Sequence, residues 1–211
     1  MPKARGRAGG WRKGRGLLGV LDPLIGPWQA TAVTPMGAAR VERVFSRVLG
    51  GRWVRLEARW FIGSGVYEEV AFFGRRPDGT LGFWSFTSDG KRSEGWLAEA
   101  PDLPAGAIAF EADMPAGRAR FAYWPRTADD PGETAADEAA AGETAADEAI
   151  AGEIAAMGDD TAADDGAGFV FVVEARTTRG WSRFTEHRHR PAPAAKPAPV
   201  RTSARADPGT S

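Results

Sequence analysis

The chain has 211 residues, 43% of which are hydrophobic, and its formal net charge is only −1. This length favours a single domain. The absence of cysteine excludes disulfide and thiolate chemistry and is consistent with a reducing compartment, so a cytoplasmic location is expected.

The small net charge hides three charged blocks. Residues 1–16 contain six Lys or Arg and no acid, and residues 127–166 contain 13 acids and no base. Residues 188–211 contain five bases and one acid. Segments of this composition bury too little apolar surface to fold alone, so they are expected to be disordered.

The aromatic residues show where a core can form, since all but Trp11 lie in residues 17–126 and 167–187. The predicted organisation has a disordered basic tail, a folded domain with an acidic low-complexity insert, and a disordered Pro/Ala-rich tail. Their respective ranges are 1–16, 17–190 with the insert at 127–166, and 191–211.

The first predicted element is a short helix or turn at Leu17–Ile25, where leucines recur at helical spacing although Gly19 and Pro23 weaken the pattern. Asp22 and Pro23 also interrupt the apolar run, so a signal peptide is not expected. No stretch approaches 18 uninterrupted apolar residues, and no membrane-spanning helix is predicted.

From Gly26 onward, short runs rich in β-forming residues alternate with turn sequences, which is typical of an all-β barrel or sandwich. Short loops leave no room for crossover helices, so the strands should pair antiparallel, up and down. The turns include Gly50-Gly51 and Asp89-Gly90, which tolerate a positive φ. The ten predicted strands are Trp28–Thr34, Ala39–Leu49, Trp53–Phe61, Val66–Arg75, Thr80–Thr87, Lys91–Ala100, Ala107–Asp113, Ala119–Arg126, Phe169–Arg176 and Trp181–His189.

Alternation within the strands separates two faces but does not show which one is inside. Val54, Leu56 and Ala58 share one face, and charged residues take the other. The strand from Phe169 differs, because its first residues are apolar on both faces.

The insert contains a ten-residue tandem repeat, in which residues 132–141 and 142–151 are nearly identical. It is rich in alanine and acids and has no aromatic residue, so it is predicted to be a loop outside the barrel between the eighth and ninth strands. The cost of closing such a loop grows only logarithmically with its length.

Several motifs resemble a bacterial lipocalin-like (calycin-type) β-barrel domain family of unknown function, and more distantly nitrobindin-like barrels. The resemblance implies a closed barrel of eight to ten strands with a central cavity and a short N-terminal helix, but no activity. Barrels of this size hold one small ligand. The motifs are Gly26-Pro27-Trp28, Met36-Gly37, Leu49-Gly50-Gly51-Arg52-Trp53, Tyr67-Glu68-Glu69-Val70-Ala71-Phe72-Phe73-Gly74, Phe83-Trp84-Ser85-Phe86-Thr87-Ser88-Asp89-Gly90 and Trp181-Ser182-Arg183-Phe184-Thr185.

The resemblance also gives Trp28 a structural role, in which it closes the base of the barrel under a basic side chain late in the chain. Arg183 is the expected cation–π partner. The candidate ligand-binding residues are Trp60, Phe72, Phe83, Tyr123, Phe171 and Arg183. Four further arginines would hold a ligand carboxylate if any of them faced inward: Arg55, Arg59, Arg118 and Arg120.

His187 and His189 are the only histidines and share one face of the last predicted strand. One interpretation is a pair of solvated residues at the strand's end, favoured by the charged neighbours. The other follows from the nitrobindin-like resemblance, in which a single histidine, here His187, is the axial ligand of haem.

No catalytic triad, metal motif or phosphate loop is present, so the chain is expected not to be an enzyme and to need no cofactor. The sequence favours binding of one small apolar or amphipathic ligand. The alternatives are a haem protein and an electrostatic interaction module that uses the charged tails and insert. A nucleic-acid partner is not expected, because the acidic insert competes for the basic tails.

Overall fold

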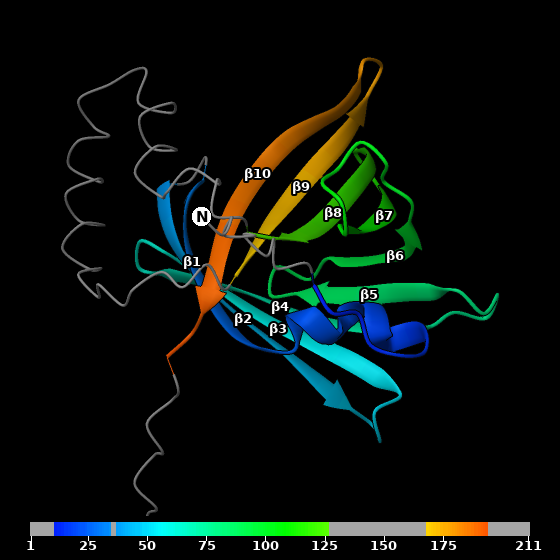
Figure 1. The fold of residues 1–211 in the computed structure, drawn as a ribbon. Helices are drawn as coiled ribbons and strands as arrows, with labels where there is room; N and C mark the ends of the chain where they lie inside the picture. Colours follow the sequence, from blue (N-terminus) through cyan, green and yellow to red (C-terminus); the bar gives the residue numbers. More distant parts are fainter. Residues whose placement is uncertain (1–10, 35–36, 127–167, 194–211) are drawn as a thin grey trace, which may run out of the picture.

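The structure, a computed structural model, describes residues 11–34, 37–126 and 168–193. Ten antiparallel strands close into a barrel in which each strand pairs with the next along the chain and β10 returns to β1 (Figure 1). This confirms the predicted all-β, up-and-down barrel. The strands are β1 (Gly26–Thr34), β2 (Gly37–Val48), β3 (Trp53–Ile62), β4 (Gly65–Arg75), β5 (Leu81–Thr87), β6 (Arg92–Ala98), β7 (Ile108–Met114), β8 (Gly117–Pro125), β9 (Phe169–Thr177) and β10 (Gly180–Pro191).

The predicted turns lie between the strands as expected. Gly50 and Gly51, which join β2 to β3, have φ angles of 66° and 76°, and Gly90, between β5 and β6, has a φ of 81°. These values lie in the left-handed region that glycine adopts without steric cost. The strand boundaries therefore follow directly from turn chemistry.

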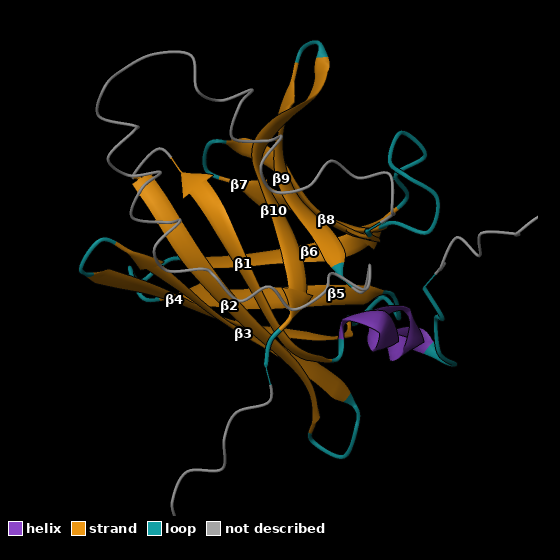
Figure 2. Ribbon diagram, turned by 60° about the vertical axis from the view of Figure 1, so that its left-hand side comes forward, coloured by secondary structure: helices purple, strands orange, loops and turns teal. Residues whose placement is uncertain are grey.

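The expected N-terminal helix is present as a 3₁₀ helix, η1 (Leu17–Leu24), at one end of the barrel (Figure 2). Residues three apart lie on the same face of a 3₁₀ helix. Leu21 and Leu24 accordingly enter the core and are fully buried, whereas Ile25 is partly exposed. Among the described residues, no helix is long and apolar enough to cross a membrane.

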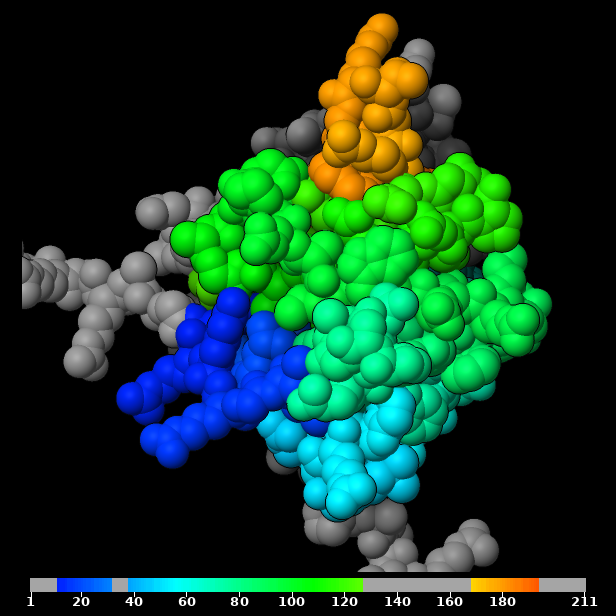
Figure 3. Space-filling view, turned by 90° about the vertical axis from the view of Figure 1, so that its right-hand side faces the viewer, coloured from blue at the N-terminus to red at the C-terminus, as the bar shows by residue number. Residues whose placement is uncertain are grey.

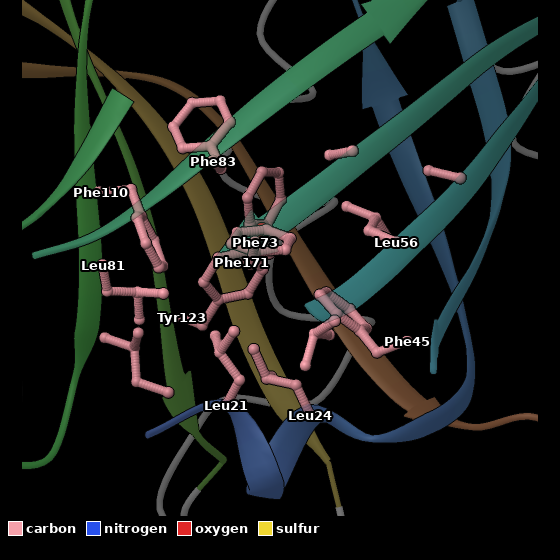
Figure 4. Packing of buried hydrophobic residues seen from close by; sticks show 14 of the residues in the cluster. Leu21, Leu24, Phe45, Leu56, Phe73, Leu81, Phe83, Phe110, Tyr123 and Phe171 are labelled. Atoms are coloured by element: carbon pink, nitrogen blue, oxygen red, sulfur yellow. The ribbon is translucent and has the colours of Figure 1, made fainter. Parts of the chain in front are cut away.

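The inner face of the barrel is the one formed by Val54, Leu56 and Ala58, each at most 2% exposed. The charged residues between them lie on the outer face, where Arg55 pairs with Glu57. The core consists largely of inward-pointing phenylalanines that meet the leucines of η1 (Figure 4). Aromatic burial of this extent is the main source of stability in such a barrel.

β9 is apolar on both faces because both faces are covered. Phe169 and Phe171 point into the core, and Val170 and Val172 are buried on the outside in a second cluster with Trp124. The connection between β6 and β7 packs on this outer cluster through Ala100, Leu103 and Ala107. Burial of both faces of β9 therefore explains why its first residues are apolar on both faces in the sequence.

An ion-pair cluster fixes the same connection to the barrel. Arg120 of β8 donates to both carboxylate oxygens of Asp102, at 2.8 and 2.7 Å, and to Glu174 of β9 at 2.7 Å. The guanidinium of Arg120 also lies 4.5 Å from the ring of Trp181. Arg120 is only 1% exposed, and each of its nitrogens has a carboxylate acceptor.

A β-bulge interrupts the pairing of β10 with β9. Arg183 lies opposite Glu174 and Thr185 lies opposite Val173, so Phe184 is an extra residue in β10. An extra residue reverses the alternation of the strand beyond it. Arg183 therefore shares the outer face with Glu174, while Thr185 and His187 share the inner face with Val173 and Phe171. The β9–β10 hairpin projects beyond the other strands (Figure 3).

β8 and β9 are direct neighbours although 43 residues separate Pro125 from Phe169 in numbering. Pro125 lies opposite Phe169, and the amide of Arg126 donates to the carbonyl of Gly168 at 3.1 Å. The two ends of the chain that flank the acidic insert, Arg126 and Gly168, therefore lie side by side at the end of the β8–β9 pair. The structure does not describe the insert, residues 1–10 or residues 194–211. The expected disorder of these segments stays a prediction, as does their role as an electrostatic interaction module.

Candidate functional site

The barrel encloses a cavity of about 50 Å³. Its walls come from the inward-pointing residues of β2, β3, β4, β5, β7, β8 and β9, which converge because alternate residues of each strand face inward. Most of the lining is aromatic or aliphatic. The lining residues are Arg43, Leu56, Trp60, Glu69, Ala71, Phe73, Phe83, Phe110, Phe121, Tyr123, Phe171 and Val173.

The cavity is small because the aromatic rings fill most of the barrel (Figure 4). The ring centroids of Phe73 and Phe110 are 5.2 Å apart, and those of Tyr123 and Phe171 are 4.9 Å apart. Pockets for drug-sized ligands measure roughly 300–1,000 Å³, and an engineered cavity that binds benzene measures about 150 Å³. The cavity therefore accepts a group of only a few non-hydrogen atoms.

Arg43 of β2 places a positive charge in this apolar interior. It is 1% exposed, and its guanidinium carbon lies 4.0 Å from the ring centroid of Phe171 and 5.8 Å from that of Trp60. Neither Nε nor Nη2 has a hydrogen-bond partner. Burial lowers the pKa of Arg43, while Tyr123 and Glu69 raise it. Arginine nevertheless stays charged in proteins, so the cavity contains a cation.

Glu69 of β4 and Tyr123 of β8 line the same space. Burial raises the pKa of Glu69, and the charge of Arg43 and a hydrogen bond with Ser85 act in the opposite direction. Burial also raises the pKa of Tyr123, so this side chain is a neutral phenol at ordinary pH. The polar end of the cavity thus contains one fixed cation and one carboxyl group whose pKa is raised by burial.

Both histidines lie inside the barrel, so their interpretation as solvated residues at the strand's end is wrong. His187 is 2% exposed and His189 is fully buried. The ring of His187 lies 5.8 Å from that of Trp60, and the ring of His189 stacks on Phe169 at 4.5 Å. None of the four imidazole nitrogens has a hydrogen-bond partner.

The buried histidines are neutral. Burial, with a smaller contribution from the charge of Arg43, lowers the pKa of His187 to about 3. Burial also lowers the pKa of His189 well below its usual value, and Arg43 and His187 add to this. A neutral imidazole has one donor and one acceptor nitrogen, so both rings retain unused hydrogen-bonding capacity.

The structure brings together four of the predicted ligand-binding residues: Trp60, Phe83, Tyr123 and Phe171 line the cavity. Phe72 does not, because it lies between the inward-pointing Ala71 and Phe73 and so faces outward. Arg183 is also outside, because the bulge at Phe184 separates it from the inward residues of β10.

The predicted cation–π contact between Trp28 and Arg183 is wrong. Trp28 donates its indole N–H to the carbonyl of Leu24 at 2.7 Å and packs edge-on against Phe169. It therefore closes the base of the barrel against η1. Arg183 instead lies over Trp124, with 5.6 Å from its guanidinium carbon to the ring centroid.

Of the further arginines considered for a ligand carboxylate, none lines the cavity. Arg55, Arg59 and Arg118 form ion pairs on the outer face, and Arg120 belongs to the cluster with Asp102. Arg43 was not predicted from the sequence, and Glu69 was placed in a family motif without being assigned to the cavity. The signal for Arg43 was its position between Val41 and Phe45, two apolar residues on the same face of one strand. Within the described residues, no group of three His, Cys, Asp or Glu side chains is arranged to hold a metal ion.

Comparison with known proteins yields only a distant structural similarity. No protein-family model matches the sequence, and no curated protein matches it. Among solved structures, the barrel is similar to the crystal structure of Rv2717c from M. tuberculosis, at 11% sequence identity and a TM-score of 0.45. The match covers 85% of this chain and 99% of that chain. At this level it carries no functional conclusion.

Proposed function

We propose that the protein is a non-enzymatic binding protein whose barrel holds one small apolar or amphipathic ligand. The supporting observation is the cavity itself, which has apolar walls and a few convergent polar groups, the usual composition of a ligand site. The closed barrel is compatible with the same function, because barrels of similar size hold one small ligand. The volume of about 50 Å³ limits the enclosed part of the ligand to a few atoms.

A cavity-filling substitution tests this proposal. Ala71 lines the cavity and is 1% exposed, so Ala71→Leu adds three carbon atoms where the ligand would lie. With 1-butanol and butanoate as probes, we expect Ala71→Leu to weaken binding at least tenfold. The measurement is the shift of the Trp60 indole N–H signal in two-dimensional NMR titrations, with that signal assigned from Trp60→Phe.

The matched control is Ala175→Leu, which makes the same change at an exposed position of β9. This variant should bind the probes as the unchanged protein does. Equal affinities in Ala71→Leu and the unchanged protein would place binding outside the cavity and contradict the proposal.

Haem binding through His187 is the second candidate. The observation in its favour is that His187 is neutral and buried on the inner face, and neither of its ring nitrogens has a hydrogen-bond partner. Haem ligation requires one unprotonated ring nitrogen that no other group occupies. The available space is against it. A cavity of about 50 Å³ does not accommodate a macrocycle, so Trp60 and neighbouring rings would have to leave the interior.

A haemin titration separates the two candidates. If haem is the ligand, the protein gives a shifted Soret band that His187→Ala loses. His189→Ala is the control and should keep the band, because His189 stacks on Phe169 near the closed base of the barrel. Identical spectra for the unchanged protein and His187→Ala would eliminate haem.

A further inference from the structure

We infer that the ligand group next to Arg43 is an anion, a carboxylate or a comparably small oxyanion. This rests on the proposed function and specifies the chemistry of the same site. The observation behind it is a buried guanidinium that lines the cavity, whose Nε and Nη2 have no hydrogen-bond partner and which forms no ion pair among the described residues.

The fold holds Arg43 inside the barrel. In the strand register Arg43 lies opposite Trp28 on one side and Ala58 on the other, and Val41 and Phe45 on the same face are buried. A one-residue slip that moved Arg43 outward would also expose both apolar neighbours. Burial of a charge without a partner is costly, and the cation–π contacts with Phe171 and Trp60 offset only part of this cost.

Arg120 is a buried arginine with a structural role, and its hydrogen bonds can be compared with those of Arg43. Both arginines are 1% exposed, but Arg120 has three hydrogen bonds to two carboxylates. In Arg43 neither Nε nor Nη2 has a hydrogen-bond partner, and the faces of Phe171 and Trp60 lie near its guanidinium. Glu69 and Tyr123 interact with its charge electrostatically. The contrast indicates that the acceptor for Arg43 comes from outside the chain.

The groups around Arg43 suit an acceptor-rich ligand. The indole N–H of Trp60 has no acceptor, and neither ring nitrogen of His187 has a partner. Glu69 is the only acidic residue among those that line the cavity, and it is engaged with Ser85. An oxyanion has two or more oxygens that match the planar fork of a guanidinium. Both a carboxylate on a short chain and a small free oxyanion are compatible with the cavity volume of about 50 Å³.

The test is an NMR titration of the full chain at pH 7 with butanoate, 1-butanol and nitrate. We expect butanoate to bind at least tenfold more tightly than 1-butanol and to shift both the Arg43 Nε–H and the Trp60 indole signals. Arg43→Met should remove this preference by weakening the binding of butanoate at least tenfold. Arg59→Met, which removes an exposed charge on the outer face, should keep the preference.

The nitrate titration distinguishes the two sources of the anion. Competition between nitrate and butanoate would support a free oxyanion as the ligand, and binding of butanoate alone would support a carboxylate on an apolar chain. If Arg43→Met does not fold, the shift of the Arg43 Nε–H signal in the unchanged protein decides, since butanoate should move it and 1-butanol should not.

Equal affinities of the unchanged protein for butanoate and 1-butanol would overturn the anion inference and leave the proposed function intact. Absence of binding by both probes would instead contradict the proposed function. An Arg43 signal that butanoate leaves in place would also overturn the inference.

Discussion

Between pH 6 and pH 5 the two buried histidines are expected to lower the free energy of unfolding by about 2–3 kcal/mol. His187 and His189 remain neutral in the folded barrel over this range, since burial lowers the pKa of the first to about 3 and that of the second well below its usual value. In the unfolded chain both titrate near a pKa of about 6.5. Unfolding therefore takes up protons, and each one contributes about 1.4 kcal/mol per pH unit.

The direction follows from the lowered pKa values. The stabilisation is complete above the unfolded pKa and is lost as the pH falls toward the folded pKa. Glu69 acts in the opposite direction, because its folded pKa is raised and its neutral form is favoured as the pH falls. Urea unfolding of Glu69→Gln at pH 5–7.5 therefore isolates the histidine contribution.

Substitution of each histidine provides the control. In the Glu69→Gln background, His187→Phe should remove about half of the pH dependence, and His189→Phe should remove about the other half. An unfolding free energy that stays constant from pH 7 to pH 5 would show that the histidines are not buried as described.

Loss of Arg120 is expected to have the second large effect. Arg120→Met leaves Glu174, whose side chain is 6% exposed, buried with only the more distant Arg183 at 3.6 Å. Breaking a buried ion pair from one side typically costs about 3–5 kcal/mol. Chemical denaturation should show a loss of about 3 kcal/mol, and amide exchange should accelerate in residues 100–107, which Asp102 ties to the barrel.

Arg118→Met is the matched control for this prediction. Arg118 also lies on β8, but it is 46% exposed and pairs with Glu111 and Asp113 near the surface. Exposed pairs contribute about 0–1 kcal/mol, so its loss should be small. If Arg120→Met costs no more than Arg118→Met, the buried cluster does not stabilise the barrel.

The barrel itself was predictable because its signals are local. Turn residues such as Gly50-Gly51 mark the strand ends, and short connections allow only neighbouring strands to pair. The sequence showed which residues share a face of each strand, but it did not show which of the two faces points into the barrel. Closure of the sheet decides that Leu56 points inward, and this depends on all ten strands together.

The polar part of the site depended on features that sequence patterns do not contain. A one-residue bulge in β10 places Arg183 outside and His187 inside, although an unbroken strand would align them. Charged neighbours made His187 and His189 resemble surface residues, whereas the ladder with β9 buries both. Arg43 was missed because arginine in an alternating strand is normally solvent-facing.

The hydrogen bond that joins Arg126 to Gly168 has an evolutionary consequence. It closes the β8–β9 pair at its base, directly beyond the pair formed by Pro125 and Phe169. Each doubling of that connection costs only about 0.6 kcal/mol of chain entropy. With the insert expected to be a flexible loop, we therefore expect gain or loss of whole ten-residue copies by replication slippage to be nearly neutral for stability, so that selection on the barrel would leave the number of copies free to vary.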